Sequence, residues 1–106
     1  IAPESWIKNT YDVLDEDRAA GAASVNADAT HERFIDGFTG YRSFWWQFDA
    51  AQGERVAMGV HGQVIYVNRA KNLVIANFAS PEATANQLRP TYKQMLAGTR
   101  ALAASF

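Results

Sequence analysis

The first fourteen residues carry large apolar side chains at helical spacing. Pro3 stands where a proline is tolerated, because the first turn of a helix needs no backbone donor there. The pattern predicts a short amphipathic helix over residues 1–14. Its apolar residues are Trp6, Ile7, Tyr11 and Leu14.

Residues 15–40 follow neither the helical nor the strand period. We therefore expect a long loop in this part of the chain. A loop of this length in so small a chain usually lines a site or packs against another part of a larger protein.

Short β-rich runs occupy residues 41–79. They are Ser43–Phe48, Arg55–Val60, Gln63–Asn68 and Leu73–Ala79. The segments between them have the lengths of hairpin connections, so we predict an antiparallel sheet of about four strands. The last two runs are apolar at successive positions instead of alternating, a pattern typical of strands that are buried on both faces. Both faces of the predicted sheet therefore need a cover.

A helix is predicted over residues 80–106. Ser80 followed by Pro81 is typical of a helix start, and Pro90 is expected to kink the helix because it removes a backbone donor. One stripe of this helix fits packing on a sheet. Its members are Leu88, Tyr92, Met95, Leu96, Thr99, Leu102, Ala103 and Phe106. The predicted fold class is thus α+β, an antiparallel sheet flanked by an N-terminal helix and a C-terminal helix.

These elements supply a cover for only one face of the sheet. The helix over residues 80–106 covers one face, and the other could be covered only by the first helix or by a segment outside these residues. A chain of 106 residues fits one domain, so we expect residues 1–106 to be a single unit and the C-terminal portion of a larger domain. The first residue is Ile1 rather than Met, which adds to this expectation.

Composition and charge argue against several partners. Ten Lys and Arg against eleven Asp and Glu give a formal net charge of −1, so the chain lacks the basic surplus that binds nucleic acid or anionic membranes. No apolar run is long enough to span a membrane. The sequence has no Cys, which excludes disulfides, thiolate metal sites and a Cys nucleophile. The cellular compartment stays open.

Three short motifs carry little weight. Ser5 and Lys8 match the Ser-x-x-Lys spacing of some serine nucleophiles, but a pattern with two fixed positions often arises by chance. His31 and Glu32 lack the second His of a zinc-protease helix. The acidic run from Asp12 to Asp17 lacks the glycine and the terminal Glu of a calcium loop. These residues predict no metal and no cofactor.

Three segments of the chain resemble the C-terminal part of a known enzyme family. They are Gly40–Phe48 (GYRSFWWQF), Ala57–Asn68 (AMGVHGQVIYVN) and Lys71–Ile75 (KNLVI). Their order and spacing are similar to those of serine hydrolases of the β-lactamase-like superfamily, in the branch that holds 6-aminohexanoate-dimer hydrolase, family VIII esterases and D-aminopeptidase-like enzymes. The resemblance implies a β-lactamase/transpeptidase-like fold in which residues 15–40 form an active-site loop.

The same resemblance implies cleavage of a small-molecule amide or ester through an acyl-enzyme. The nucleophilic Ser, its Lys and a catalytic Tyr would lie upstream, in the N-terminal part of the same hydrolase. The 106 residues alone are therefore expected to be inactive. The resemblance implies no cofactor and no metal, and it adds no nucleic-acid or membrane partner.

The family's third motif, Lys/His-Thr/Ser-Gly, falls on Ala57–Gly59 in the favoured register. The backbone N–H of the next residue, Val60, would then complete an oxyanion hole. Ala and Met replace the cation and the hydroxyl that hold a substrate carboxylate in many penicillin-recognising members, which favours an amidase or esterase over a β-lactamase. An alternative register places the motif at His61–Gly62 and the donor at Gln63.

The turn that holds these residues supplies candidate substrate contacts. Gly59 and Gly62 allow a close approach of the backbone, and His61 offers a polar contact at the mouth of a cleft. Without the resemblance, the segment Gly59–Gly62 also fits an ordinary hairpin with a surface histidine.

The aromatic segment offers a candidate pocket wall at Tyr41 and Trp45. Trp45 and Trp46 are adjacent in the predicted strand, so their side chains point to opposite faces and only one of them can line a pocket. A non-enzymatic interpretation is also open. In it the chain is a stand-alone module that binds a small ligand or a protein in an aromatic pocket around Trp45 and Tyr41. A catalytically inactive relative of the hydrolases is a third interpretation.

Overall fold

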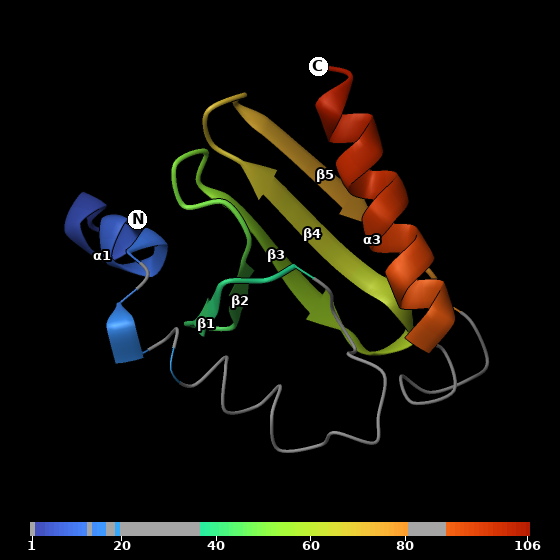
Figure 1. Ribbon diagram of the computed structural model, residues 1–106, viewed down its shortest axis with the longest axis horizontal. Coiled ribbons are helices and arrows are strands. Elements are labelled where there is room, and N and C mark those ends of the chain that lie inside the picture. Colours follow the sequence, from blue (N-terminus) through green and yellow to red (C-terminus); the bar gives the residue numbers. More distant parts are fainter. Residues whose placement is uncertain (1, 13, 17–18, 20–36, 81–88) are drawn as a thin grey trace.

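The computed structural model describes residues 2–12, 14–16, 19, 37–80 and 89–106 (Figure 1). The five strands form one antiparallel sheet in the order β1-β2-β3-β4-β5. Together with the two described helices this is an α+β arrangement, as the sequence predicted. The elements in chain order are α1 (Glu4–Tyr11), β1 (Gly40–Arg42), β2 (Trp45–Gln47), β3 (Glu54–Gly59), the 3₁₀ turn η1 (Val60–Gly62), β4 (Gln63–Asn68), β5 (Leu73–Asn77) and α3 (Arg89–Ala104).

The aromatic segment forms two strands where the sequence predicted one. The predicted strand over residues 43–48 begins instead at Trp45, and Gly40, which was assigned to the loop, begins a separate strand β1. Between β1 and β2, Ser43 and Phe44 have φ angles of 50° and 68°. Two successive left-handed residues make the tightest hairpin turn, and Asn-Gly is its usual sequence. Ser-Phe lacks that signal, so the turn could not be recognised from the residue types.

The predicted strand over residues 63–68 is confirmed as β4, whereas its neighbours differ at their ends. β3 begins and ends one residue earlier than predicted, because Val60 belongs to the turn η1. β5 ends at Asn77, two residues before the predicted end. The hairpin connections predicted between the runs are all present, and each strand pairs with the next along the chain.

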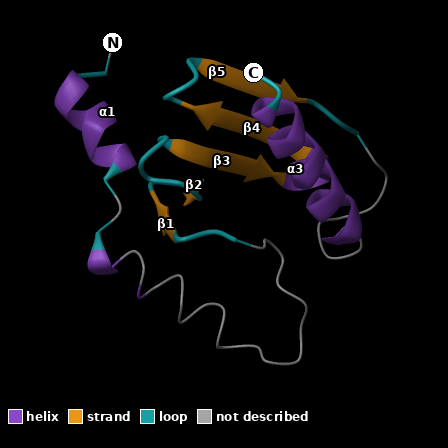
Figure 2. Cartoon of the chain, turned by 45° about the horizontal axis from the view of Figure 1, so that its top comes forward, coloured by secondary structure: helices purple, strands orange, loops and turns teal. Residues whose placement is uncertain are grey.

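The core lies between the sheet and α3, which crosses one face of the strands (Figure 2). Val56 on β3 and Tyr66 on β4 are almost completely buried, with exposed fractions of 0% and 1%. From the helix side Leu96 and Ala103 pack against them. Leu102 and Phe106, which the sequence placed on the same stripe, are instead largely exposed.

The opposite side of β3, β4 and β5 carries apolar side chains without a described cover, and we call it the open face. Its members, by strand register, are Ala57, Ile65, Val67, Val74 and Ala76. Val74 is 64% exposed and Ile65 is 42% exposed. The continuous apolar runs therefore do not correspond here to strands that are buried on both faces, because α3 packs on one face alone.

Helix α1 is shorter than predicted and packs differently. It ends at Tyr11, with Asp12 as the residue after its last turn. Trp6 is 58% exposed, so the apolar stripe is not buried. The buried residue of the helix is Thr10, which lies against the sheet at the end of the helix. The helix thus contacts the sheet end-on, beside the β1–β2 edge (Figure 1), and leaves the open face uncovered.

Several predictions concern residues outside the described ranges. Most of the predicted loop over residues 15–40 is among them, as are His31 and Glu32. Of the described residues in that range, Asp15, Glu16 and Ala19 are helical, which the sequence pattern did not predict. The predicted helix start at Ser80–Pro81 also extends into residues 81–88, which are not described. Within the described part, α3 begins at Arg89, so Pro90 stands in the first turn, where a proline needs no backbone partner.

Candidate functional site

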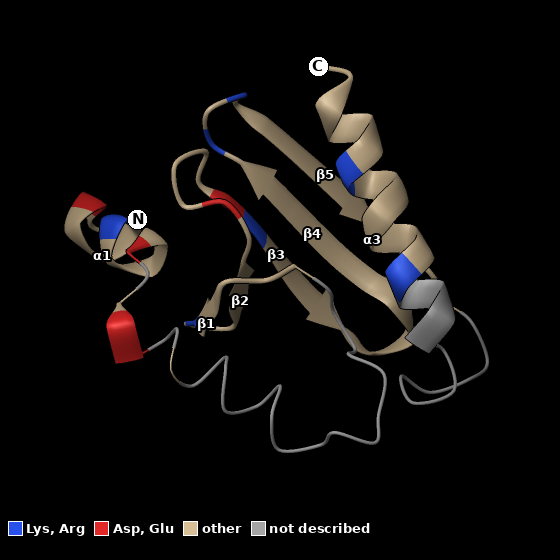
Figure 3. Ribbon diagram, in the orientation of Figure 1, with Lys and Arg blue, Asp and Glu red and all other residues tan. Residues whose placement is uncertain are grey.

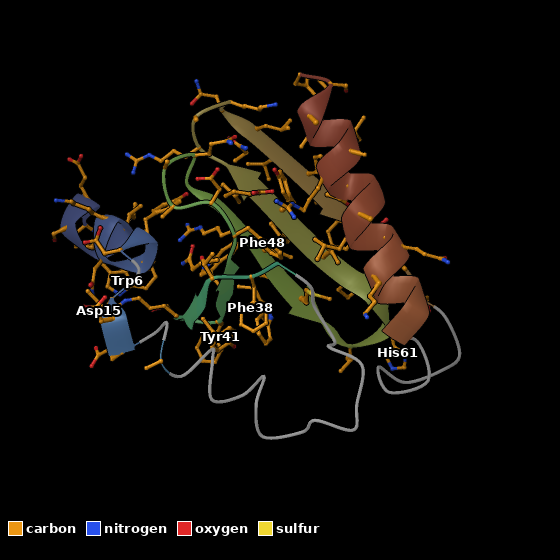
Figure 4. The ribbon with its side chains drawn as sticks, in the orientation of Figure 1. Trp6, Asp15, Phe38, Tyr41, Phe48 and His61 are labelled. Atoms are coloured by element: carbon orange, nitrogen blue, oxygen red, sulfur yellow. The ribbon has the colours of Figure 1, made fainter. Side chains whose placement is uncertain are left out.

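The turn between β3 and β4 holds four of the candidate site residues in one place. Gly59 ends β3, and the next three residues form η1. His61 has φ 58° and ψ 30°, in the left-handed region, and Gly62 follows with φ 78°. Val60 is 69% exposed at this end of the sheet, and the side chain of His61 lies near the start of the described part of α3 (Figure 4).

Two side-chain amides tie this turn to the end of β5. The Asn77 Nδ2 donates a hydrogen bond to the carbonyl oxygen of Gly62 at 3.2 Å and contacts the Met95 Sδ of α3 at 2.9 Å. The Gln63 Nε2 donates to the carbonyl oxygen of Ala79. These contacts fix the turn against both β5 and α3.

Position 62 requires a glycine for two reasons. Its φ of 78° is rarely adopted by residues with a side chain, and an added Cβ would lie 3.2 Å from the Cβ of Ala79. The turn is therefore closely packed against the chain that follows β5. The sequence pattern identified the glycine but not the roles of Asn77 and Ala79. The one signal for Asn77 was that it is a polar residue within an apolar run, and Ala79 gave no signal.

A fixed turn of this kind offers backbone N–H groups at the end of a sheet. Such groups stabilise an oxyanion when they are held in place before the reaction. Val60 lies in the turn, outside the ladder, whereas Gln63 is paired with Gly59 as the first residue of β4. This arrangement favours Val60 over Gln63 as the available backbone donor.

No other catalytic group accompanies the turn among the described residues. Ser5 and Lys8 lie on exposed α1, beside the β1–β2 edge (Figure 1), while the turn joins β3 to β4. The described residues also contain no group of three or more His, Cys, Asp or Glu side chains that could hold a metal ion. The turn could therefore supply one part of a reaction centre, with the nucleophile and base provided elsewhere.

The two candidate aromatic residues lie on opposite faces of the sheet. Tyr41 pairs with Trp46 in the register of β1 and β2, and their ring centroids are 4.6 Å apart. Phe38 packs edge-on to the same Trp46, with the centroids 5.0 Å apart. Trp45 points the other way, toward the side of the sheet that carries Gly59. Tyr41 and Trp45 therefore do not form a common aromatic pocket.

A buried cation under the end of α1 was not anticipated from the sequence. Arg55 is 7% exposed, and its guanidinium carbon lies 3.5 Å from the ring centre of Tyr11 and 4.2 Å from that of Trp45. Its Nη1 donates to the carbonyl and hydroxyl oxygens of Thr10, at 3.2 and 2.7 Å. Burial lowers the pKa of Arg55, although the Tyr11 hydroxyl partly opposes that effect.

A second polar cluster joins α3 to the sheet on the core side. Arg100 donates to both carboxylate oxygens of buried Glu54, from Nε at 2.7 Å and from Nη2 at 3.0 Å. The Tyr66 hydroxyl donates to the same carboxylate at 3.1 Å. The hydrogen bonds to Glu54 raise the pKa of Arg100, and burial raises the pKa of Tyr66. Since every one of these groups is partnered, we interpret the cluster as structural.

Comparison with known proteins identifies no relative of this chain. No protein-family model, no curated protein and no solved structure matches this chain. Among the described residues, no helix is long and apolar enough to cross a membrane.

Proposed function

We propose that these residues form the C-terminal segment of a serine hydrolase that cleaves a small amide or ester. A Ser outside the 106 residues attacks the substrate carbonyl carbon and forms a tetrahedral oxyanion. Collapse of this intermediate expels the amine or alcohol and leaves an acyl-enzyme, which water then hydrolyses. The Val60 N–H is one of the donors that stabilise the oxyanion. Within the α+β class, this function goes with a β-lactamase/transpeptidase-like fold.

The observation that carries the proposal is the fixed turn between β3 and β4. Asn77 of β5 and Gln63 of β4 tie the turn to the chain at the end of β5, and Gly62 allows its close approach to Ala79. A donor held in this way needs little reorganisation when the oxyanion forms, which is what oxyanion stabilisation requires. The turn also directly follows Ala57–Gly59, the segment that resembles the third motif of the family.

A second support comes from the open face. Ile65 on β4 and Val74 on the edge strand β5 expose apolar surface on a sheet that has a well-packed core on its other face. Contiguous apolar surface of this kind typically marks a place where another part of a protein packs. The N-terminal part of the same hydrolase would cover it and would bring the nucleophile to the end of the sheet.

The proposal predicts different effects of two substitutions at Val60. Val60→Pro removes the backbone donor, and the local geometry accepts it: Gly59 has φ −114° and ψ 166°, as a residue before proline prefers, and position 60 opens a 3₁₀ turn. Val60→Ala keeps the donor. In the protein expressed from its complete reading frame, we expect Val60→Pro to lower kcat for a nitrophenyl ester by about 10²–10³, and Val60→Ala to lower it far less.

Circular dichroism and melting temperature serve as controls that both variants are folded. Equal activity of folded Pro and Ala variants would contradict the assignment of Val60. The same pair of substitutions at Gln63 then tests the alternative register. Wild-type protein without hydrolase activity would favour the interpretation as a binding module or as an inactive relative.

A further inference from the structure

An open cavity of about 370 Å³ lies at the end of the sheet where β3 begins. It is opposite to the end that carries the turn η1, since β3 runs from Glu54 to Gly59 between the two. The end of α1 forms one wall, and the turns before β3 and after β4 form the others. The lining includes Lys8, Tyr11, Asp12, Gln52, Gly53 and Arg69.

The cavity has a surplus of positive charge. Lys8 and Arg69 line it, and neither forms an ion pair with a carboxylate of the described residues. Asp12 is the acidic residue of the lining. Figure 3 shows basic residues on α1 and in the turn between β4 and β5, at this end of the sheet. The lining therefore carries a net charge of one positive unit.

A third cation stands behind the wall of the cavity. Arg55 stacks on the ring of Tyr11 at 3.5 Å, and Arg69 lies 5.2 Å from the centre of the same ring. Arg55 is 7% exposed, and its Nε is buried without a hydrogen-bond partner. Its described contacts are neutral oxygens and aromatic rings, so no carboxylate compensates its charge. A buried cation without a counter-ion raises the positive potential nearby.

The shape of the cavity depends on close packing at Gly53. An added Cβ there would lie 2.9 Å from the Cβ of Arg69 and 3.4 Å from the ring of Tyr11, and the residue has φ 60°. Gly53 thus brings the ring of Tyr11 and the base of the Arg69 side chain together. Ala50, Ala51 and Ala70 add methyl groups to the lining. The cavity consequently combines apolar surface with two cationic side chains.

We propose that this cavity binds a small organic molecule with a single carboxylate and an apolar body. Lys8 and Arg69 hold the carboxylate, and the Tyr11 ring with the alanine methyl groups receives the body. One negative charge matches the net charge of the lining. Phosphate is disfavoured because it has no apolar body to place against the Tyr11 ring and the alanine methyl groups. The proposal does not depend on the proposed hydrolase function.

Isothermal titration calorimetry of the protein from its complete reading frame tests the site, with sodium benzoate as the probe. Benzamide is the matched neutral ligand, and inorganic phosphate is the competing anion. We expect saturable binding of benzoate, weaker binding of phosphate and none of benzamide. Tighter binding of phosphate than of benzoate, or equal binding of benzamide, would overturn the proposed ligand class.

Three variants locate the binding. Arg69→Gln and Lys8→Gln should each weaken benzoate binding about tenfold, as expected for the loss of one charge-assisted hydrogen bond. Lys93→Gln removes the same charge from α3 and should leave binding unchanged. Lys8 is exposed, so its substitution stays informative if Arg69→Gln fails to fold. Absence of benzoate binding, or equal weakening by all three variants, would refute the site.

Discussion

The ion pair between Glu54 and Arg100 offers a sharp test of how α3 is held on the sheet. Glu54→Gln keeps the shape of the side chain but removes its charge, and it turns an NH₂ group toward one of the guanidinium donors. In the unsubstituted protein the Glu54 side chain is 7% exposed, whereas the Arg100 side chain is 41% exposed. One charge-assisted hydrogen bond is lost, and the guanidinium loses its counter-ion.

The size of the effect follows from this difference in exposure. Removing one partner of a fully buried ion pair costs roughly 3–5 kcal/mol. Because water can still reach Arg100, we expect a smaller loss of about 2 kcal/mol in the free energy of unfolding, near the value of one hydrogen bond to a charged group. Arg100→Met should cost more, roughly 3–5 kcal/mol, because it leaves the buried Glu54 carboxylate without its counter-ion. The double variant should cost less than the sum of the two.

Urea denaturation followed by tryptophan fluorescence measures these free energies on the protein from its complete reading frame. Glu16→Gln is the matched control, because it removes the same charge at an exposed position and should change stability by less than about 0.5 kcal/mol. A loss of less than about 0.5 kcal/mol for Glu54→Gln would refute the reasoning. So would strictly additive effects in the double variant.

Three further outcomes are expected. Burial raises the pKa of Tyr66 above its usual 10.0, so the folded state keeps a proton that the unfolded state loses. The free energy of unfolding should therefore fall as pH rises above about 10, by up to about 1.4 kcal/mol per pH unit, and Tyr66→Phe should reduce this dependence in denaturation series at several pH values. Gly62→Ala should lower the free energy of unfolding by about 1–2 kcal/mol, because of its φ and its contact with Ala79; a neutral effect would argue against the fixed turn. Finally, the open face should make the 106 residues alone associate in sedimentation velocity experiments, and a monomer with a cooperative melt would favour the stand-alone module.

Local patterns predicted the central strands well. Runs of β-forming residues, separated by short segments such as His61–Gly62, predicted β4 with its correct ends and the antiparallel pairing of β3, β4 and β5. The turn between β1 and β2 was missed because Ser43 and Phe44 adopt left-handed angles that their residue types do not favour. Such angles are imposed by the pairing of the flanking strands, which acts through contacts and not through propensity.

The sequence predicted only those parts of the candidate site that are formed by consecutive residues. Gly59–Gly62 could be identified because the turn lies within four consecutive residues. Asn77 reaches that turn from β5, fifteen residues away, and nothing in a linear pattern indicates such a contact. Arg55 shows the same limit: its position beneath Tyr11 and Trp45 depends on where α1 ends against the sheet.

The central claim is that a nucleophilic Ser outside these residues reacts at the end of this sheet. The most direct measurement treats the protein from its complete reading frame with a serine-directed fluorophosphonate and maps the adduct by mass spectrometry. We predict a single adduct on a Ser that precedes residue 1 and is followed three positions later by Lys. An adduct on Ser5 or on any other Ser of residues 1–106, no adduct, or a reading frame that encodes these residues alone would contradict the account.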